Sequence, residues 1–255
     1  MPLDIKICGL KTLDTLDAAL GAGADLVGLV FFPRSPRHLS LAEAAPLAGH
    51  ARGKALVTAL TVDADDDTLA AIVEAVRPDL LQLHGRETPA RVAQIRARFG
   101  RPVMKAVGIA GPEDVAAARA FAGVADRLLL DAKPPKGAVL PGGNGLAFDW
   151  NLIADFAPAG LASLDGAESF MLSGGLTPEN VGEALRLTRA PGVDVSSGVE
   201  SAPGVKDPAR IVAFVQAARA EARQSAAPAT ATRPPPDFRE RVAAGVAANE
   251  TSEAP

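Results

Sequence analysis

Two residues that could carry proton-transfer chemistry stand at the ends of short apolar segments. Cys8 closes the segment that begins at Asp4, and Asp131 closes the segment Arg127 to Asp131. A thiolate can abstract a carbon-bound proton if cationic surroundings or local dipoles lower its pKa, and Lys6 and nearby turn amides are the candidates for this. A carboxylic acid partly shielded from water can stay protonated long enough to donate. A lone cysteine is commonly a small buried hydrophobe and a strand-end aspartate commonly caps a turn, but together they indicate acid/base chemistry.

Two loops rich in glycine and serine indicate an anion site late in the chain. One runs from Ser173 through Gly175 into a helix start that we expect at Thr177, and the other runs from Ser196 to Gly198. Glycine permits close backbone approach to a ligand, and helix N-termini offer oriented N–H groups. Each loop alone also fits an ordinary tight turn. Their joint occurrence predicts a phosphate-bearing ligand, held by Ser173, Gly174, Gly175, Ser196, Ser197 and Gly198.

These residues need a scaffold, and the hydrophobic pattern predicts eight strand-helix units. Short apolar runs alternate with longer segments of helical period, as in parallel sheets covered by helices. We therefore expect a single α/β domain with the (β/α)8 TIM-barrel fold; an open, doubly wound sheet is the alternative. The expected strands are Asp4–Cys8, Leu26–Phe31, Ala55–Val62, Leu80–Leu83, Val103–Val107, Arg127–Asp131, Ser169–Ser173 and Val193–Ser196. The expected helices begin near Thr12, Ser40, Asp66, Glu87, Gly111, Asp149, Thr177 and Asp207.

In such a barrel, active sites lie at the carboxyl ends of the strands, and phosphate commonly binds after strands seven and eight. The predicted barrel places Cys8 and Asp131 at the ends of strands one and six, and both glycine-serine loops after the last two strands. We assign residues 1–222 to a catalytic barrel and residues 223–255, which are rich in alanine and proline, to a disordered tail.

Composition narrows the class of protein. The chain has 255 residues, of which 48% are hydrophobic and 22% charged, which fits one globular domain of this size. A formal net charge of −4 argues against nucleic acid or an anionic membrane as partner. One cysteine excludes an internal disulfide, and we find no signal sequence or long apolar run. These features predict a cytoplasmic protein with no metal site and no membrane span.

Seven motifs in register resemble the phosphoribosylanthranilate isomerase family of tryptophan biosynthesis. They are Lys6-Ile7-Cys8-Gly9, Phe32-Pro33-Arg34-Ser35-Pro36-Arg37, Gln82-Leu83-His84-Gly85, Leu130-Asp131, Gly142-Gly143-Asn144-Gly145 with Phe148-Asp149-Trp150, Ser173-Gly174-Gly175-Leu176, and Asp194-Val195-Ser196-Ser197-Gly198-Val199-Glu200. The resemblance implies a cofactor-independent Amadori rearrangement of N-(5-phosphoribosyl)anthranilate to 1-(2-carboxyphenylamino)-1-deoxyribulose 5-phosphate. It also implies that Asp131 is the general acid, which protonates the ring oxygen, and that Cys8 is the general base.

The resemblance also implies roles for the residues around this pair. Arg37 is expected to hold the anthranilate carboxylate, which suits a planar guanidinium. Asp194 is expected to bind sugar hydroxyls or the migrating amine, with turn capping as the alternative. His84 is expected to line and position rather than act as base, and Lys6 to be buried, either paired with a carboxylate or tuning the thiol.

Two features depart from the family pattern or extend it. Many members carry phenylalanine near the end of strand three, where this chain reads Leu60-Thr61-Val62-Asp63, so one wall of the anthranilate pocket should differ. The loop Pro134 to Leu146 is rich in glycine and proline, and we expect it to act as a lid. We expect a monomer, with a homodimer as the alternative.

Three alternative functions remain. The histidine-pathway isomerase performs the same type of rearrangement, but we expect aspartate in place of Cys8 there. Indole-glycerol-phosphate synthase needs an extension before strand one and a lysine/glutamate set. A non-catalytic phosphate-binding barrel belongs to a different class, and the presence of both Cys8 and Asp131 argues against it.

Overall fold

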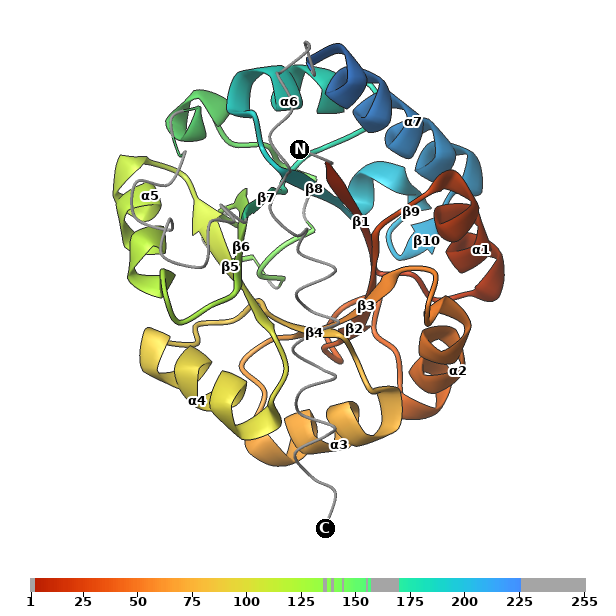
Figure 1. The fold of residues 1–255 in the computed structure, drawn as a ribbon, viewed down its shortest axis with the longest axis vertical. Helices are drawn as coiled ribbons and strands as arrows, with labels where there is room; N and C mark the ends of the chain where they lie inside the picture. Colours follow the sequence, from red (N-terminus) through yellow and green to blue (C-terminus); the bar gives the residue numbers. More distant parts are fainter. Residues whose placement is uncertain are drawn as a thin grey trace, which may run out of the picture.

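Eight parallel strands close into a barrel in the computed structural model, which describes residues 3–134, 137–138, 140–143, 145–154, 156 and 170–225. Each strand pairs with the next, and β1 closes the ring on β8 with Lys6 opposite Asp194. Figure 1 looks down this barrel, with the helices around its outside. The strands are β1 (Asp4–Cys8), β2 (Leu26–Phe31), β3 (Leu56–Thr61), β4 (Leu80–Leu83), β5 (Val103–Ile109), β6 (Arg127–Ala132), β7 (Phe170–Leu172) and β8 (Gly192–Val195).

The predicted TIM barrel is therefore confirmed and the open sheet is wrong. Three strands have the predicted bounds, and the others differ by at most two residues at a described end. Ser169, at the predicted start of β7, lies outside the described residues.

Seven α-helices of the described chain cover the barrel, and several begin at the predicted caps. Thr12 caps α1, and Ser40 forms a capping box with Glu43 at the start of α2, which satisfies N–H groups that have no partner within the helix. Gly111 precedes α5, and Pro112 occupies the first turn. The helices are α1 (Leu13–Ala22), α2 (Leu41–Ala51), α3 (Asp66–Val76), α4 (Pro89–Phe99), α5 (Pro112–Ala118), α6 (Val181–Thr188) and α7 (Pro208–Ser225). Among the described residues, no helix is long and apolar enough to cross a membrane.

The helix predictions after β6 and β7 are wrong in detail. Asp149 caps only a 3-10 turn, η2 (Trp150–Ile153). The helix expected at Thr177 begins at Val181, because the Asn180 side chain accepts a bond from the Thr177 N–H and donates to the Gly175 carbonyl. These two bonds hold the intervening residues in a turn.

The carboxyl-terminal boundary also differs from the prediction. Helix α7 runs to Ser225, so residues 223–225, which were assigned to the tail, belong to the barrel's last helix. The remainder of the predicted tail, 226–255, lies outside the described residues. Between β8 and α7 the chain forms the 3-10 turn η3 (Ser197–Val199) and an unpredicted antiparallel ribbon of β9 (Glu200–Ala202) and β10 (Val205–Lys206).

Apolar packing fills two regions of this fold. The larger cluster joins the outward faces of the strands to the helices, and a smaller one lies inside the barrel. The inner cluster comprises Leu26, Leu80, Met104, Ala106, Leu129 and Met171. Leu80 on β4 and Leu129 on β6 each precede by two positions a polar residue of the same strand that lines a cavity, Gln82 and Asp131; Met171 precedes Ser173, just after β7, in the same way. The barrel interior is thus packed toward the amino ends of its strands, which leaves the carboxyl ends for a site.

Candidate active site

A cavity of about 790 Å³, partly open to solvent, lies at the carboxyl ends of the strands. The cavity brings together eleven of the twelve predicted site residues: Cys8, Arg37, His84, Asp131, Ser173, Gly174, Gly175, Asp194, Ser196, Ser197 and Gly198. The twelfth, Lys6, is fully buried on β1.

Strand β1 brings Lys6 and Cys8 to one side of the barrel interior. The Lys6 ammonium donates to Asp194 Oδ1 at 2.8 Å, and both side chains are buried. Gly28, opposite Cys8 on β2, makes room for both side chains. A Cβ at this position would meet Cys8 Sγ at 2.8 Å and Lys6 Nζ at 3.1 Å. Lys6 is therefore paired with a carboxylate, as expected, and it also lies beside the thiol.

Lys6, the candidate cation, acts to lower the pKa of the Cys8 thiol, but the net shift is upward. Burial raises the pKa of the thiol above its ordinary value, and the nearby Asp194 charge adds to this effect. Lys6 and Lys206 act in the opposite direction but do not outweigh burial. Burial is the largest of these effects because it removes the thiolate from water, and the Asp194 charge offsets part of the attraction exerted by Lys6. Although burial alone would lower the pKa of Lys6, Asp194 and Cys8 raise it, so this lysine stays charged.

Asp131 is anchored at the end of β6 by two groups. Its Oδ1 accepts from the Ala132 N–H at 2.9 Å, and its Oδ2 lies 3.3 Å from His84 Nε2. On the other side of the imidazole, Gln82 Nε2 lies 3.2 Å from His84 Nδ1. With Gln82 as donor, the histidine proton resides on Nε2 and faces the carboxylate. His84 is therefore placed to orient Asp131, in agreement with a positioning role.

The turn after β2 delivers Arg37 to the cavity. The Leu39 N–H donates to the Val30 carbonyl at 2.9 Å, which folds the segment back against its own strand. Gly9 is required here, because its φ is +80° and a Cβ would meet the Arg37 side chain at 2.7 Å. The buried guanidinium is already paired along one edge: Nε and Nη2 donate to the two carboxylate oxygens of Glu200 at 2.7 and 2.8 Å.

The two phosphate-loop candidates lie against each other. A Cβ on Gly198 would fall 1.8 Å from the Leu176 carbonyl oxygen, so only glycine fits this contact. Gly174 and Gly175 both have positive φ, which favours glycine. The Ser196 hydroxyl donates to the Cys8 carbonyl at 3.2 Å and links the second loop to the end of β1. The two loops therefore form one continuous wall of the cavity.

Sequence reasoning missed two residues of this site. Glu200 ends the last of the seven motifs but received no role, and Lys206 stood in no motif. The Lys206 ammonium donates to Glu200 Oε1 at 2.6 Å and to the Ser196 carbonyl at 2.8 Å. The one signal available for Glu200 was its place two positions after Gly198, at the end of the second glycine-serine loop. Nothing in the sequence pointed to Lys206.

Two residues of the departing stretch at strand three form part of the cavity wall. Leu60 and Val62 line the cavity, whereas the Thr61 side chain is fully buried and is absent from the described lining. The replaced wall is therefore aliphatic. In the predicted lid, Leu140 to Gly143 line the cavity, and the Gly143 carbonyl accepts from Arg37 Nη2 at 3.3 Å. Residues 135, 136, 139 and 144 of this loop lie outside the described part.

The fold and the site together define a barrel enzyme that acts on a small molecule with acid/base groups at the carboxyl ends of its strands. Residues 5–217 match the family model for N-(5'-phosphoribosyl)anthranilate (PRA) isomerase. The N-(5'-phosphoribosyl)anthranilate isomerase of Rhodopseudomonas palustris (strain BisA53) is 64% identical over 88% of this chain and 100% of its own.

Solved structures give the same result. A phosphoribosylanthranilate isomerase in complex with reduced 1-(o-carboxyphenylamino)-1-deoxyribulose 5-phosphate matches with a TM-score of 0.72 and 31% identity, covering 86% of this chain and 99% of the other. Monomers generated from the dimeric phosphoribosylanthranilate isomerase of Thermotoga maritima match with a TM-score of 0.72 and 32% identity over the same shares. The chain belongs to the N-(5'-phosphoribosyl)anthranilate isomerase family, so it is an isomerase of tryptophan biosynthesis that converts N-(5'-phosphoribosyl)anthranilate to 1-(2-carboxyphenylamino)-1-deoxyribulose 5-phosphate.

Proposed function

We propose that Asp131 is the general acid and Cys8 the general base of this rearrangement. The observation that supports this most directly is that both line one cavity, whose wall also contains two glycine loops and a guanidinium. Asp131 gives its proton to the furanose ring oxygen as the bond from that oxygen to C1 breaks. The nitrogen lone pair then forms the C=N bond of a protonated Schiff base.

Cys8 then takes the proton from C2, and the electrons of that C–H bond move to form the enolamine. Protonation at C1 and loss of the hydroxyl proton at C2 give the ketone. Because burial raises the pKa of Cys8, the thiol is largely protonated in the empty cavity. The Schiff-base cation supplies a positive charge beside it, which favours the thiolate when the base is needed.

The other predicted residues bind the two ends of the substrate. The Nη1 side of Arg37 is the edge that Glu200 leaves to the anthranilate carboxylate, because Nε and Nη2 are occupied. The backbones of Ser173 to Gly175 and Ser196 to Gly198 bind the phosphate. Asp194 accepts from a sugar hydroxyl or from the migrating amine while it holds Lys6, and His84 positions Asp131.

We further propose that the reaction needs no cofactor, because the rearrangement is an internal redox isomerisation in which C1 is reduced as C2 is oxidised. We propose a cytoplasmic monomer that takes a phosphosugar substrate, with the Pro134–Leu146 loop as a lid. The biosynthetic relatives and the lone cysteine support the compartment. A homodimer is the alternative, since a dimeric family member exists in Thermotoga maritima, and sedimentation at micromolar concentration decides between them.

The test of the acid/base pair is rescue of tryptophan auxotrophy in a bacterium lacking this isomerase. Wild type, Cys8→Ser and Asp131→Asn are compared, and the purified variants are assayed for binding of the reduced product analogue. Growth with wild type alone, together with retained analogue binding and a loss in kcat of about 10²- to 10⁴-fold, supports both roles. Growth with all three keeps the reaction but overturns the residue roles.

A further inference from the structure

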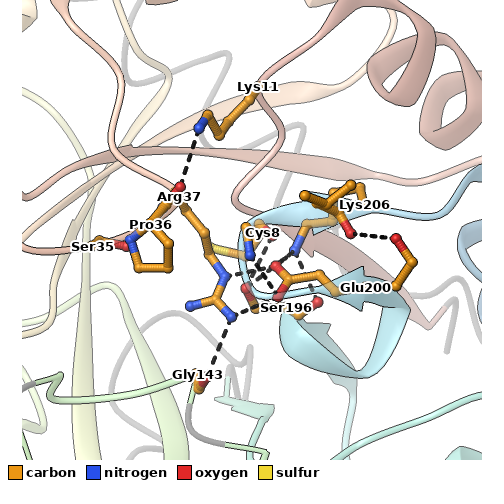
Figure 2. Close-up of polar contacts among 12 residues, drawn as sticks. Cys8, Lys11, Ser35, Pro36, Arg37, Gly143, Ser196, Glu200 and Lys206 are labelled. Atoms are coloured by element: carbon orange, nitrogen blue, oxygen red, sulfur yellow. Dashed lines mark hydrogen bonds and ion pairs between the residues drawn. The ribbon is translucent and has the colours of Figure 1, made fainter.

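The carboxylate of Glu200 lies beside the cavity and accepts four hydrogen bonds, but the proposed acid/base chemistry gives it no role. Figure 2 shows it between Arg37 and Lys206, beside the end of β1. It accepts from Arg37 Nε at 2.7 Å, Arg37 Nη2 at 2.8 Å, Lys206 Nζ at 2.6 Å and the Gly204 N–H at 3.1 Å. The side chain is 4% exposed, so these bonds are shielded from water.

We propose that Glu200 is a positioning residue that fixes the direction in which Arg37 presents its free edge, and so determines recognition of the substrate carboxylate. The proposal rests on the proposed role of Arg37. A guanidinium on a flexible side chain can rotate about several bonds. The two parallel bonds to Glu200 remove that freedom, because a bidentate pair fixes both the plane and the direction of the guanidinium.

Charge supports the same conclusion. Burial alone would raise the pKa of Glu200, but bonds from Arg37 and Lys206 outweigh it and lower the pKa below the ordinary value. Glu200 therefore stays ionised in the neutral range. An ionised carboxylate can accept from both Arg37 nitrogens at once, whereas an amide of the same shape offers one acceptor and one donor.

The ribbon β9–β10 holds the carboxylate in place. Glu200 begins β9 and Lys206 ends β10, so the two charged residues meet across one short ribbon. Gly204 lies in the connection with φ +79°, and a Cβ there would meet the Pro36 carbonyl oxygen at 2.6 Å. The ribbon is therefore seated directly against the segment that carries Arg37, and a shift of the ribbon would be passed to the guanidinium.

Glu200→Gln distinguishes two roles for Glu200: positioning Arg37 for the substrate carboxylate, or only stabilising the fold. The binding of two analogues is compared: the reduced product analogue, and the same compound without the ring carboxylate. We expect Glu200→Gln to weaken binding of the carboxylated analogue about tenfold or more, the size of a lost charged hydrogen bond. Binding of the analogue without the carboxylate should change less than about twofold on the same scale.

Glu221→Gln is the matched control, because Glu221 is a buried carboxylate paired with Arg186 at 2.5 Å and neither residue belongs to the cavity lining. It should leave both affinities unchanged.

Arg37→Gln separates this inference from the role on which it rests. If Arg37→Gln weakens binding of both analogues equally, the proposed role of Arg37 is wrong. If Arg37→Gln weakens binding of the carboxylated analogue only, that role stands. The inference about Glu200 is then overturned if Glu200→Gln weakens binding of neither analogue, or of both equally. Should Glu200→Gln fail to fold, Glu200→Asp carries the same comparison, because it keeps the charge but withdraws it from Arg37.

Discussion

Gly28→Ala tests whether the position of the Cys8 thiol limits the reaction. The backbone of Gly28 lies outside the left-handed region, so alanine introduces no backbone strain there. Its Cβ, however, would lie 2.8 Å from Cys8 Sγ and 3.0 Å from Cys8 Cα. The methyl group therefore displaces the proposed base, and it also comes within 3.1 Å of Lys6 Nζ.

The size of the effect follows from that contact. Ordinary van der Waals contact with a Cβ begins at 3.4 Å, so the thiol and the added carbon must separate by about 0.6 Å. Since a misplacement of about 1 Å can cost about 10²-fold in rate, we expect kcat to fall about 10- to 100-fold. Crowding of the strand should also lower the free energy of unfolding by about 1–3 kcal/mol.

The assay is steady-state turnover of N-(5'-phosphoribosyl)anthranilate, with urea unfolding of the same samples. Gly49→Ala is the matched control: Gly49 lies within α2, nothing approaches its Cβ position within 4 Å, and alanine should keep kcat and raise stability by up to about 1 kcal/mol. In a Cys8→Ala background, Gly28→Ala should cost no further activity, because the displaced group is gone. A folded Gly28→Ala enzyme with kcat within twofold of wild type would refute the reasoning.

Two further predictions concern charge. Burial raises the pKa of Cys8, so log(kcat/KM) should rise with pH along a limb centred above the ordinary thiol pKa of 9.0. Lys6→Met should move the centre of that limb to a higher pH. A limb centred below 9.0 in the wild-type enzyme contradicts this prediction. The buried ammonium of Lys105 donates to Glu87 Oε2 at 2.8 Å and to the Gly85 carbonyl at 2.7 Å. Lys105→Met should therefore lower the free energy of unfolding by about 3–5 kcal/mol in urea titrations, whereas a loss below about 1 kcal/mol would show that the pair contributes little.

The strands could be predicted closely because a parallel strand buried on both faces reads as a continuous apolar run. Leu26–Phe31 is such a run, and all six residues are buried. The positions of Cys8, Asp131 and the two loops followed from the barrel rule alone, since a strand end identifies the functional face.

Long-range side-chain pairing could not be predicted in the same way. The turn at Thr177 depends on the Asn180 side chain, which competes locally with helix formation. Glu200 and Arg37 are 163 positions apart in the chain, and no local pattern announces that they meet. The net direction of the Cys8 pKa could not be derived from the sequence for a related reason. Lys6 is two residues away in the chain, but the burial of the thiol and its nearness to Asp194, which both raise its pKa, depend on contacts between distant segments.

The raised pKa of Cys8 gives the proposed mechanism its order. Burial raises the pKa of the thiol, and the Asp194 charge adds to this effect, so the free enzyme does not hold a ready thiolate. A base that is neutral until a cation forms beside it cannot act before ring opening, because only the protonated Schiff base supplies that cation. Replacing Asp194 by an amide would release the Lys6 charge toward the thiol and lower the Cys8 pKa. In the proposed mechanism, the buried and neutral thiol therefore requires that Asp131 act first and Cys8 second.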